Sequence, residues 1–274
     1  MNLIDLLDLA KLSAEVAGKF LIENRYTLNE EISNIGRDIK LEADTKTESL
    51  IRDILSESNI PILGEEGEHN VKDFGSKYWV VDPLDGTANY NRNIPICCIS
   101  IGLIKDMKPI LGVIYDFNND DMYVGDIYSK KSVMNDQIIK TSNKSNKEEG
   151  ILITGLPHDS DYSEQTLKNM IYDMQKWQKI RMMGSAAMAA CYVASGKVEQ
   201  YQEKGVYLWD VIAGAAIVVL AIGGFLMTQG KSKPAPKGKR ARRPPEGAKR
   251  PKKRPKGAGK PKPRKAAPKK IEEE

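Results

Sequence analysis

The residues best suited to bind a cation or catalyse a reaction are in the segment Asp-Pro-Leu-Asp-Gly-Thr at 82–87, where two carboxylates flank a proline. It follows the apolar run 78–81, which predicts a buried strand that stops at Asp82. Proline restricts the backbone between the two aspartates, so both carboxylates and the Leu84 carbonyl can converge on one point. Mg²⁺ prefers oxygen ligands of this kind, and the amides that follow can bind a phosphate. The alternative is a surface turn, because these residue types all favour turns.

Three further acidic residues make a cation site more plausible than a surface turn. Glu65 and Glu66 lie between glycines directly after a predicted strand at 60–63, where they could equally form a solvated loop. Asp210 follows Trp209 at the start of an apolar helix and could simply be an N-cap residue. An aspartate that begins a helix also points its oxygens outward, so capping and cation binding are compatible.

The rest of the sequence predicts alternating helices and strands, which is typical of a layered α/β or α+β architecture. The predicted helices cover residues 3–24, 45–58, 162–177, 185–195 and 211–222. The predicted strands cover residues 60–63, 78–81, 97–104, 110–115, 122–126, 132–134, 150–155, 179–182, 198–202 and 225–228. The apolar run 211–227 could instead span a membrane, but its length is at the short limit for a span and it contains a glycine pair. We interpret it as a buried helix and a strand, and expect no membrane contact.

Charge divides the chain into two regions. Residues 231–274 contain 19 Lys and Arg against 4 Glu, a net charge of +15, and 9 of the 14 prolines. Because the whole chain carries +5, residues 1–230 carry −10. The basic tail has too little apolar surface to fold, so we expect it to be disordered. It is either a solvated extension or a segment for nonspecific contact with nucleic acid or another polyanion.

The three cysteines, Cys97, Cys98 and Cys191, have no zinc-type spacing and indicate reduced thiols in a cytoplasmic protein. The N-terminus contains Asp5 and Asp8 and has no secretory pattern. We therefore expect cytoplasmic localisation.

Four strings, in order, resemble the inositol monophosphatase family of magnesium-dependent, lithium-sensitive phosphatases, over about residues 1–230. They are Gly-Glu-Glu at 64–66, Trp-Val-Val-Asp-Pro-Leu-Asp-Gly-Thr-Ala-Asn-Tyr at 79–90, Gly-Ser-Ala-Ala at 184–187 and Trp-Asp at 209–210. The resemblance implies the layered sandwich of that family, with a metal-binding half at about 1–135 and a second half at about 136–230. The strand and helix that usually close the second half are missing, since the basic tail begins at residue 231.

The resemblance also implies roles for individual residues and two or three Mg²⁺ ions. The implied metal ligands are Glu65, Asp82, the Leu84 carbonyl, Asp85 and Asp210. Asp44 and Thr87 would orient and help to deprotonate the attacking water, with Glu66 in support. The amides of Gly86 and Thr87 would hold the phosphate. The implied substrate contacts are Asp85, Gly184, Ser185, Ala186 and Glu203.

The substrate implied by the resemblance is a small phosphomonoester. Inositol monophosphate or a related polyol or sugar phosphate is the favoured substrate. The Ala-Asn-Tyr sequence after Thr87 is more similar to the inositol phosphatases than to the nucleotidases, which usually have Lys-Glu-Phe there. A 3′(2′),5′-bisphosphate nucleotidase and a fructose-1,6-bisphosphatase remain alternatives, as does a non-enzymatic polyanion-binding protein acting through the tail. The resemblance further suggests a homodimer.

Overall fold

The computed structural model of the 274-residue chain describes residues 1–35, 38–67, 74–156 and 162–222. The predicted strand at 225–228 and the basic tail at 231–274 lie outside the described residues. The expectations about tail disorder and about the missing closing elements therefore stay predictions. So does the division of residues 1–230 into two halves.

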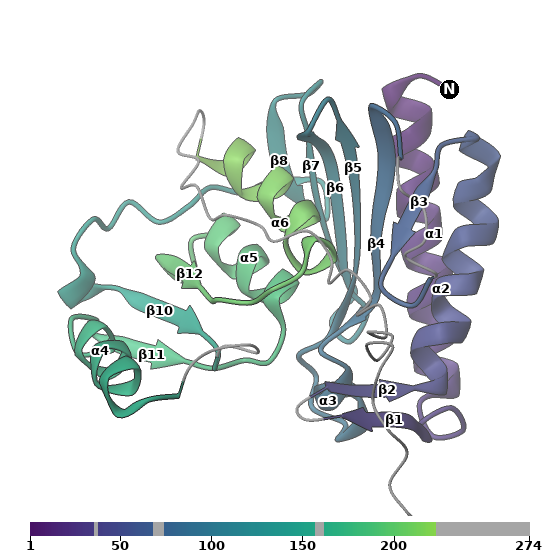
Figure 1. The fold of residues 1–274 in the computed structure, drawn as a ribbon. Helices are drawn as coiled ribbons and strands as arrows, with labels where there is room; N and C mark the ends of the chain where they lie inside the picture. The colour runs from purple at the N-terminus through teal and green to yellow at the C-terminus, as the bar shows by residue number, and fades with distance from the viewer. Residues whose placement is uncertain (36–37, 68–73, 157–161, 223–274) are drawn as a thin grey trace, which may run out of the picture. The chain divides into compact units, whose positions relative to one another are not determined.

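A seven-stranded sheet is the centre of the structure (Figure 1). Its strands are arranged in the order β3-β4-β5-β6-β7-β8-β9, with β3 parallel to β4 and every other pair antiparallel. They are β3 (Ile62–Gly64), β4 (Lys77–Asp85), β5 (Cys98–Lys105), β6 (Lys108–Asp116), β7 (Asp121–Asp126), β8 (Lys131–Met134) and β9 (Gln137–Ile138). The central strands are buried along almost their whole length, as expected for a sheet that is covered on both faces.

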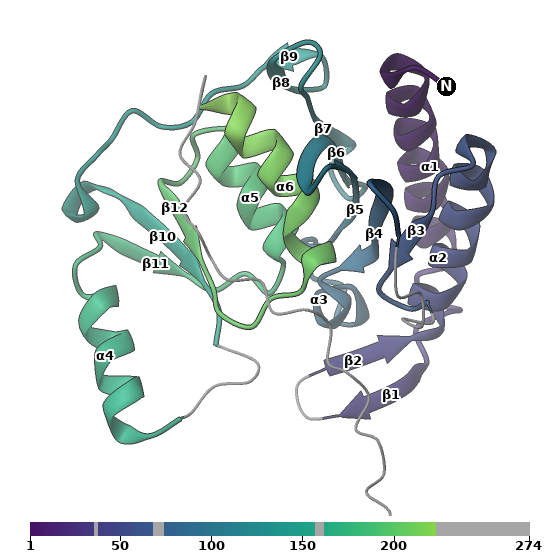
Figure 2. The same cartoon turned by 45° about the horizontal axis from the view of Figure 1, so that its top comes forward.

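Two helices, α1 (Leu3–Asn24) and α2 (Glu42–Leu55), cover one face of this sheet (Figure 2). Leu6, Ala10, Ala14, Ala17 and Leu21 form the buried stripe of α1, at the spacing that predicted this helix. A short 3₁₀ helix, η1 (Ser56–Ser58), extends α2. An antiparallel hairpin of β1 (Glu31–Ile35) and β2 (Asp38–Leu41) precedes α2, and the sequence analysis missed it.

Helix α6 (Leu208–Ala221) packs against the opposite face, and three glycines in register on β5, β6 and β7 make the close approach possible. Gly112 lies opposite both Gly102 and Gly125 in the sheet. A Cβ at any of these three positions would overlap α6. The Ser132 hydroxyl also donates to the Ile217 carbonyl at 2.5 Å. The glycine stripe therefore sets how closely α6, and Asp210 with it, approaches the sheet.

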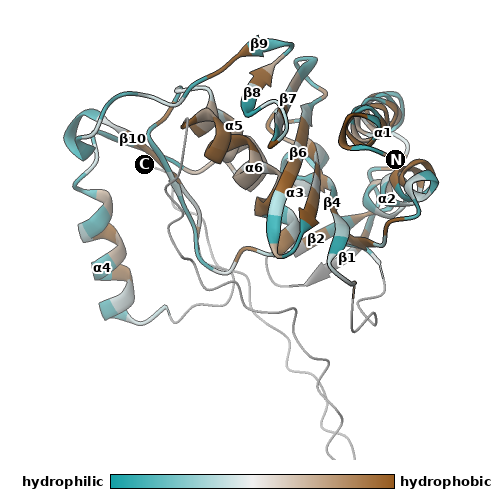
Figure 3. Ribbon diagram, turned by 90° about the horizontal axis from the view of Figure 1, so that it is seen from above, coloured by the Kyte–Doolittle hydropathy of each residue, from teal (hydrophilic) through white to brown (hydrophobic). Residues whose placement is uncertain are grey.

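Helix α5 (Ala186–Ala194) packs against α6 and also against a second, parallel sheet in the order β11-β10-β12. Its strands are β10 (Ile151–Thr154), β11 (Lys179–Arg181) and β12 (Gln200–Gln202). The short 3₁₀ helix η2 (Lys147–Glu149) precedes β10, and α4 (Glu164–Met174) connects β10 to β11. In Figure 3 the strands of the large sheet are mainly hydrophobic, whereas α4 alternates between hydrophobic and hydrophilic residues. These layers confirm the predicted α/β sandwich.

Some predicted boundaries are wrong. Helix α2 begins at Glu42 rather than near residue 45, because the Asp44 carboxylate caps it by accepting the Leu41 amide at 2.6 Å. Strand β4 continues to Asp85 instead of stopping at Asp82. In the part of the chain that the structure covers, no helix has both the length and the apolar character of a membrane span. The apolar helix α6 has 14 residues and is roughly 21 Å long.

Candidate active site

The two aspartates of the 82–87 string lie at the end of β4, on either side of a β-bulge. Asp82 pairs with Ser100 of β5 and Asp85 pairs with Cys98, so β4 carries one extra residue between them. Both side chains are buried, with exposures of 2% and 8%. The Leu84 amide donates to Asp82 Oδ1 at 3.0 Å, which fixes the first carboxylate against the bulge.

Asp85 is held by the first turn of α5. Ser185 Oγ donates to Asp85 Oδ2 at 2.5 Å, and the Ala187 amide donates to the same oxygen at 2.7 Å. The Ala186 amide donates to Oδ1 at 3.2 Å. Burial raises the pKa of Asp85, while these three donors act against the rise. The structure therefore joins Asp85 to the predicted substrate contacts Ser185 and Ala186 through direct hydrogen bonds.

Asp44 and Thr87 lie within hydrogen-bond distance of each other. The Thr87 hydroxyl lies 3.0 Å from Asp44 Oδ1 and 3.0 Å from the Leu84 carbonyl oxygen, so its single proton can serve either acceptor. Burial raises the pKa of Asp44 to about 7, despite hydrogen bonds from the Leu41 amide and the Thr87 hydroxyl. Near neutral pH this carboxyl can therefore either accept a proton or give one up.

Gly86 forms the turn between the second aspartate and helix α3 (Thr87–Asn91). Its φ of +92° is in the region that favours glycine. A Cβ there would also lie 2.7 Å from the Ile96 carbonyl oxygen. The helix begins at Thr87, and a larger residue at position 86 would displace its first turn.

Glu65 and Glu66 follow β3 in a loop that faces the same carboxylates. The Glu65 amide donates to the Val81 carbonyl at 3.2 Å, and the Glu66 carboxylate pairs with Lys40 at 2.9 Å. Burial raises the pKa of Glu65 well above its usual value, and the charges of Asp210, Asp44 and Glu66 raise it further. Glu65 is therefore in the same electrostatic environment as the distant Asp210.

Asp210 lies within the first turn of α6, so the alternative interpretation of Asp210 as the N-cap residue is wrong, and its role as a metal ligand stays a prediction. The helix begins at Leu208, and Asp210 Oδ2 accepts the Tyr207 amide at 2.6 Å. Burial raises the pKa of Asp82, and the charges of Glu65, Asp85 and Asp210 add to the rise. Four acidic residues from three separate segments thus interact across one region.

The donor chemistry of this region fits a hard divalent cation, since it offers carboxylates and a carbonyl. Among the residues that the structure describes, however, no three Asp, Glu, His or Cys side chains converge closely enough to form a complete metal site. Hydrogen bonds hold several of the carboxylate oxygens instead. Asp85 is directed at α5, Asp82 at the Leu84 amide and Asp210 at the Tyr207 amide. The convergence of Asp82 and Asp85 that the sequence suggests is therefore incomplete.

Glu203 follows β12 and interacts with two residues that the sequence analysis did not select. The Tyr201 hydroxyl donates to Glu203 Oε2 at 3.1 Å, and the Glu203 carboxylate lies against Gly155. The pKa of Tyr201 is raised by burial and then by the charges of Glu203 and Asp85. This effect of Asp85 on Tyr201 indicates that the end of β12 is near the end of β4.

Asn89 is a further residue that the sequence analysis missed. Its side-chain amide donates to the Met183 carbonyl at 2.7 Å and to the Ile96 carbonyl at 2.8 Å, which joins α3 to the segment before Gly184. It lies in the 79–90 string, but nothing in that string indicates a partner 94 residues away.

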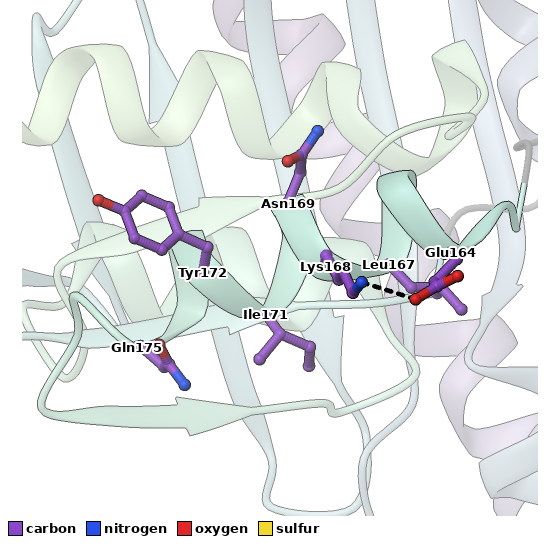
Figure 4. A pocket seen from close by; sticks show the side chains of 7 residues that line it. All are labelled: Glu164, Leu167, Lys168, Asn169, Ile171, Tyr172 and Gln175. Atoms are coloured by element: carbon purple, nitrogen blue, oxygen red, sulfur yellow. Dashed lines mark ion pairs between the residues drawn. The ribbon is translucent and has the colours of Figure 1, made fainter.

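A surface hollow of about 580 Å³ lies elsewhere, along α4 (Figure 4). Seven residues between Glu164 and Gln175 line it, including Leu167, Ile171 and Tyr172. None of the predicted site residues is among them. One helix alone therefore forms this hollow, and it has no connection to the carboxylates.

Comparison with known proteins decides the family. The sequence profile of the inositol monophosphatase family matches residues 5–253. The chain belongs to the inositol monophosphatase family. This confirms the resemblance and makes the protein a phosphoric monoester hydrolase by family.

Two relatives and one solved structure illustrate the similarity. The chain is 30% identical to rat inositol monophosphatase 1 over 234 residues, which covers 81% of this chain and 82% of the relative. It is 31% identical to the Nus factor SuhB of Xylella fastidiosa over 223 residues, or 78% of each chain. An inositol monophosphatase structure from Anabaena has 31% identity and a TM-score of 0.69, covering 81% of this chain and 83% of the other.

Proposed function

We propose that the protein hydrolyses a small phosphomonoester in a Mg²⁺-dependent reaction, with two or three ions in the working site. The observation that carries this proposal is the set of buried acidic residues whose pKa values are raised by burial and by one another. Divalent cations would neutralise this mutual repulsion, and oxygen donors are the ligands that Mg²⁺ prefers. The proposed ligands are Glu65, Asp82, the Leu84 carbonyl, Asp85 and Asp210.

Bound Mg²⁺ would supply an acidified water and neutralise charge on the leaving oxygen. The residues of the chain would do the rest. Asp44, with its pKa near 7, would accept a proton through Thr87, since the Thr87 hydroxyl can donate to Asp44 while its lone pair accepts from water. Phosphoryl transfer depends mainly on positioning and electrostatic stabilisation, which such a site provides.

The proposed phosphate and substrate contacts are those that the family resemblance implies. The amides of Gly86 and Thr87 would hold the phosphate, with Glu66 supporting the Glu65 side. Gly184, Ser185, Ala186 and Glu203 would contact the substrate hydroxyls together with Asp85. Inositol monophosphate, or a related polyol or sugar phosphate, is the proposed substrate because relatives of 30% and 33% identity are inositol monophosphatases.

A substrate panel with Mg²⁺ tests this proposal. Inositol monophosphate, fructose 1,6-bisphosphate and adenosine 3′,5′-bisphosphate should each be assayed for phosphate release, with and without chelator. The proposal expects chelator-sensitive turnover, highest on the inositol phosphate. Highest turnover on the nucleotide or the fructose bisphosphate would reassign the substrate, and turnover in excess chelator would overturn the mechanism.

The charge of residues 231–274 favours a second candidate function, which is nonspecific binding of nucleic acid or another polyanion. The net charge of +15 on this segment would make such binding strongly salt-dependent. Deleting residues 231–274 separates the two functions, since turnover should remain and salt-sensitive polyanion affinity should vanish. Cytoplasmic localisation and a homodimer stay predictions, which fractionation and light scattering can test.

A further inference from the structure

Glu48 is a buried carboxylate with no role in the site described so far. It lies on α2 one turn after Asp44, and only 2% of it is exposed. Its Oε1 accepts Arg52 Nε at 2.7 Å, and its Oε2 accepts the backbone amide of Glu66 at 2.7 Å. Both of its oxygens are therefore used, one by a cation on its own helix and the other by the loop that carries Glu65 and Glu66.

The loop is shaped to admit this pair. A Cβ on Gly64 would overlap the Glu48 carboxylate, and a Cβ on Gly67 would overlap the Arg52 guanidinium. Arg52 also donates from Nη1 to the Ile62 carbonyl at 3.2 Å. The pair thus contacts the loop from the end of β3 to Gly67, and the two glycines provide the space for it.

These contacts fix the backbone on both sides of Glu65. The amide of Glu65 donates to the Val81 carbonyl of β4, and the amide of Glu66 donates to Glu48. With both flanking peptide groups held, the direction of the Glu65 side chain is set by β4 on one side and by α2 on the other. Asp44 lies on the same helix, so α2 positions both Asp44 and the loop opposite it.

We propose that Glu48 and Arg52 form a positioning pair that directs the Glu65 carboxylate for binding a divalent cation. This inference rests on the proposed function, because it takes Glu65 as a metal ligand. Residues that orient metal ligands typically change metal affinity or activity by about 10- to 100-fold when they are altered. The pair should therefore determine affinity for Mg²⁺ more than affinity for substrate.

Two variants of the full chain, Glu48→Gln and Arg52→Lys, test the pair. The amide in Glu48→Gln keeps only one acceptor, so it cannot serve both Arg52 and the Glu66 amide. Lysine in Arg52→Lys keeps the charge but loses the planar fork that reaches both Glu48 and the Ile62 carbonyl. Glu42→Gln is the matched control, because Glu42 and Lys46 form an exposed ion pair on the same helix at the same i,i+4 spacing.

The measurement is calorimetric titration of each purified protein with MgCl₂ alone, followed by turnover at saturating Mg²⁺. We expect the Kd for Mg²⁺ to rise about 10-fold or more in both test variants and to stay within about twofold of wild type in Glu42→Gln. The KM for substrate at saturating Mg²⁺ should stay within about twofold in all of them. If the ion pair only stabilises the fold, its loss would lower the melting temperature and leave the Kd for Mg²⁺ unchanged, and that result would overturn the inference.

The outcomes also separate this inference from the proposed function. A wild-type chain that neither binds Mg²⁺ nor hydrolyses phosphomonoesters would refute the proposed function, and the inference with it. The result that would refute only the positioning pair is a wild-type chain that binds Mg²⁺ and hydrolyses phosphomonoesters, together with the same Kd for Mg²⁺ in Glu48→Gln and Glu42→Gln. If Glu48→Gln does not fold, as circular dichroism would show, Arg52→Lys decides the question by the same titration.

Discussion

The two sheets of this protein differ in how completely the described residues cover them. Helices pack on both faces of the seven-stranded sheet, and its central strands are buried. The three-stranded sheet packs against α5, whereas α4, which connects two of its strands, has no buried residue at all. All of the candidate metal ligands except Asp210 lie on β4 or directly after β3 of the first sheet, and α6 brings Asp210 to it. Under the proposed function, the metal chemistry would therefore depend on the well-packed sheet, while α5 and the end of β12 would supply substrate contacts.

The largest expected effect is on the first sheet, in Asp82→Asn. Loss of a buried carboxylate at the bulge of β4 should reduce kcat/KM by about 10³-fold or more, which corresponds to about 4 kcal/mol. Phosphate release at saturating Mg²⁺ measures it. Asp53→Asn, an exposed position on α2, should retain wild-type activity. Equal activity in both variants would show that the end of β4 is not catalytic.

The pH dependence of stability tests the buried acids of the same sheet. Since folding raises the pKa of Asp44 from 3.8 to about 7, this carboxyl contributes stability below pH 3.8 that is lost as the pH rises through 7. The effect is of the order of 4 kcal/mol. In chelator, the melting temperature should therefore fall between pH 4 and pH 8, with a smaller fall in Asp44→Asn. The raised pKa of Asp44 would be contradicted if the melting temperature fell equally with pH in the wild type and in Asp44→Asn.

The contact between α6 and the first sheet predicts a loss of stability in Gly112→Ala. The new methyl group would overlap the α6 backbone at Ala213, and overpacking of this kind costs about 1–3 kcal/mol. Urea unfolding measures it. Gly75→Ala is unsuitable as a control because Gly75 has a φ of +70°. The exposed substitution Asp53→Asn serves instead and should leave the unfolding midpoint unchanged.

The junction between the two sheets is tested by Ser185→Ala, which removes the hydroxyl that donates to Asp85 and caps α5. We expect a roughly 10-fold loss of kcat/KM, equivalent to about 1.4 kcal/mol, for one lost hydrogen bond to a charged group. Ser185→Thr keeps the hydroxyl and should restore most of the activity. If threonine and alanine behave alike, the hydroxyl is not what positions Asp85.

The smallest effect is expected on α4, in Leu167→Ser and Ile171→Ser. These side chains are 40% and 54% exposed, so each substitution should change the free energy of unfolding by no more than about 0.5 kcal/mol. Urea unfolding of the full chain measures it. A loss above about 2 kcal/mol would show that the apolar side of α4 is covered in the full chain, and would remove the contrast between the two sheets.

The local structure could be predicted because it depends on near neighbours in the chain. Apolar spacing identified α1, β5, β6 and α5, and the apolar run 78–81 identified β4, although this strand continues past the predicted end to Asp85. Boundaries failed where side-chain capping moved them. Asp44 and Asp210 each reach back to an amide three residues earlier, so α2 and α6 start sooner than their apolar patterns suggest.

The sequence by itself determined which residues could do chemistry, because the residue types and the spacing of the four strings are local facts. Tertiary structure alone decided how those residues interact. Asp85 meets Ser185 across 100 residues, Asp44 meets Thr87 across 43, and a glycine on each of three strands sets the position of α6. Such contacts depend on strand register and helix packing, and neither can be read from a segment of sequence because each is fixed by burial shared among many distant residues.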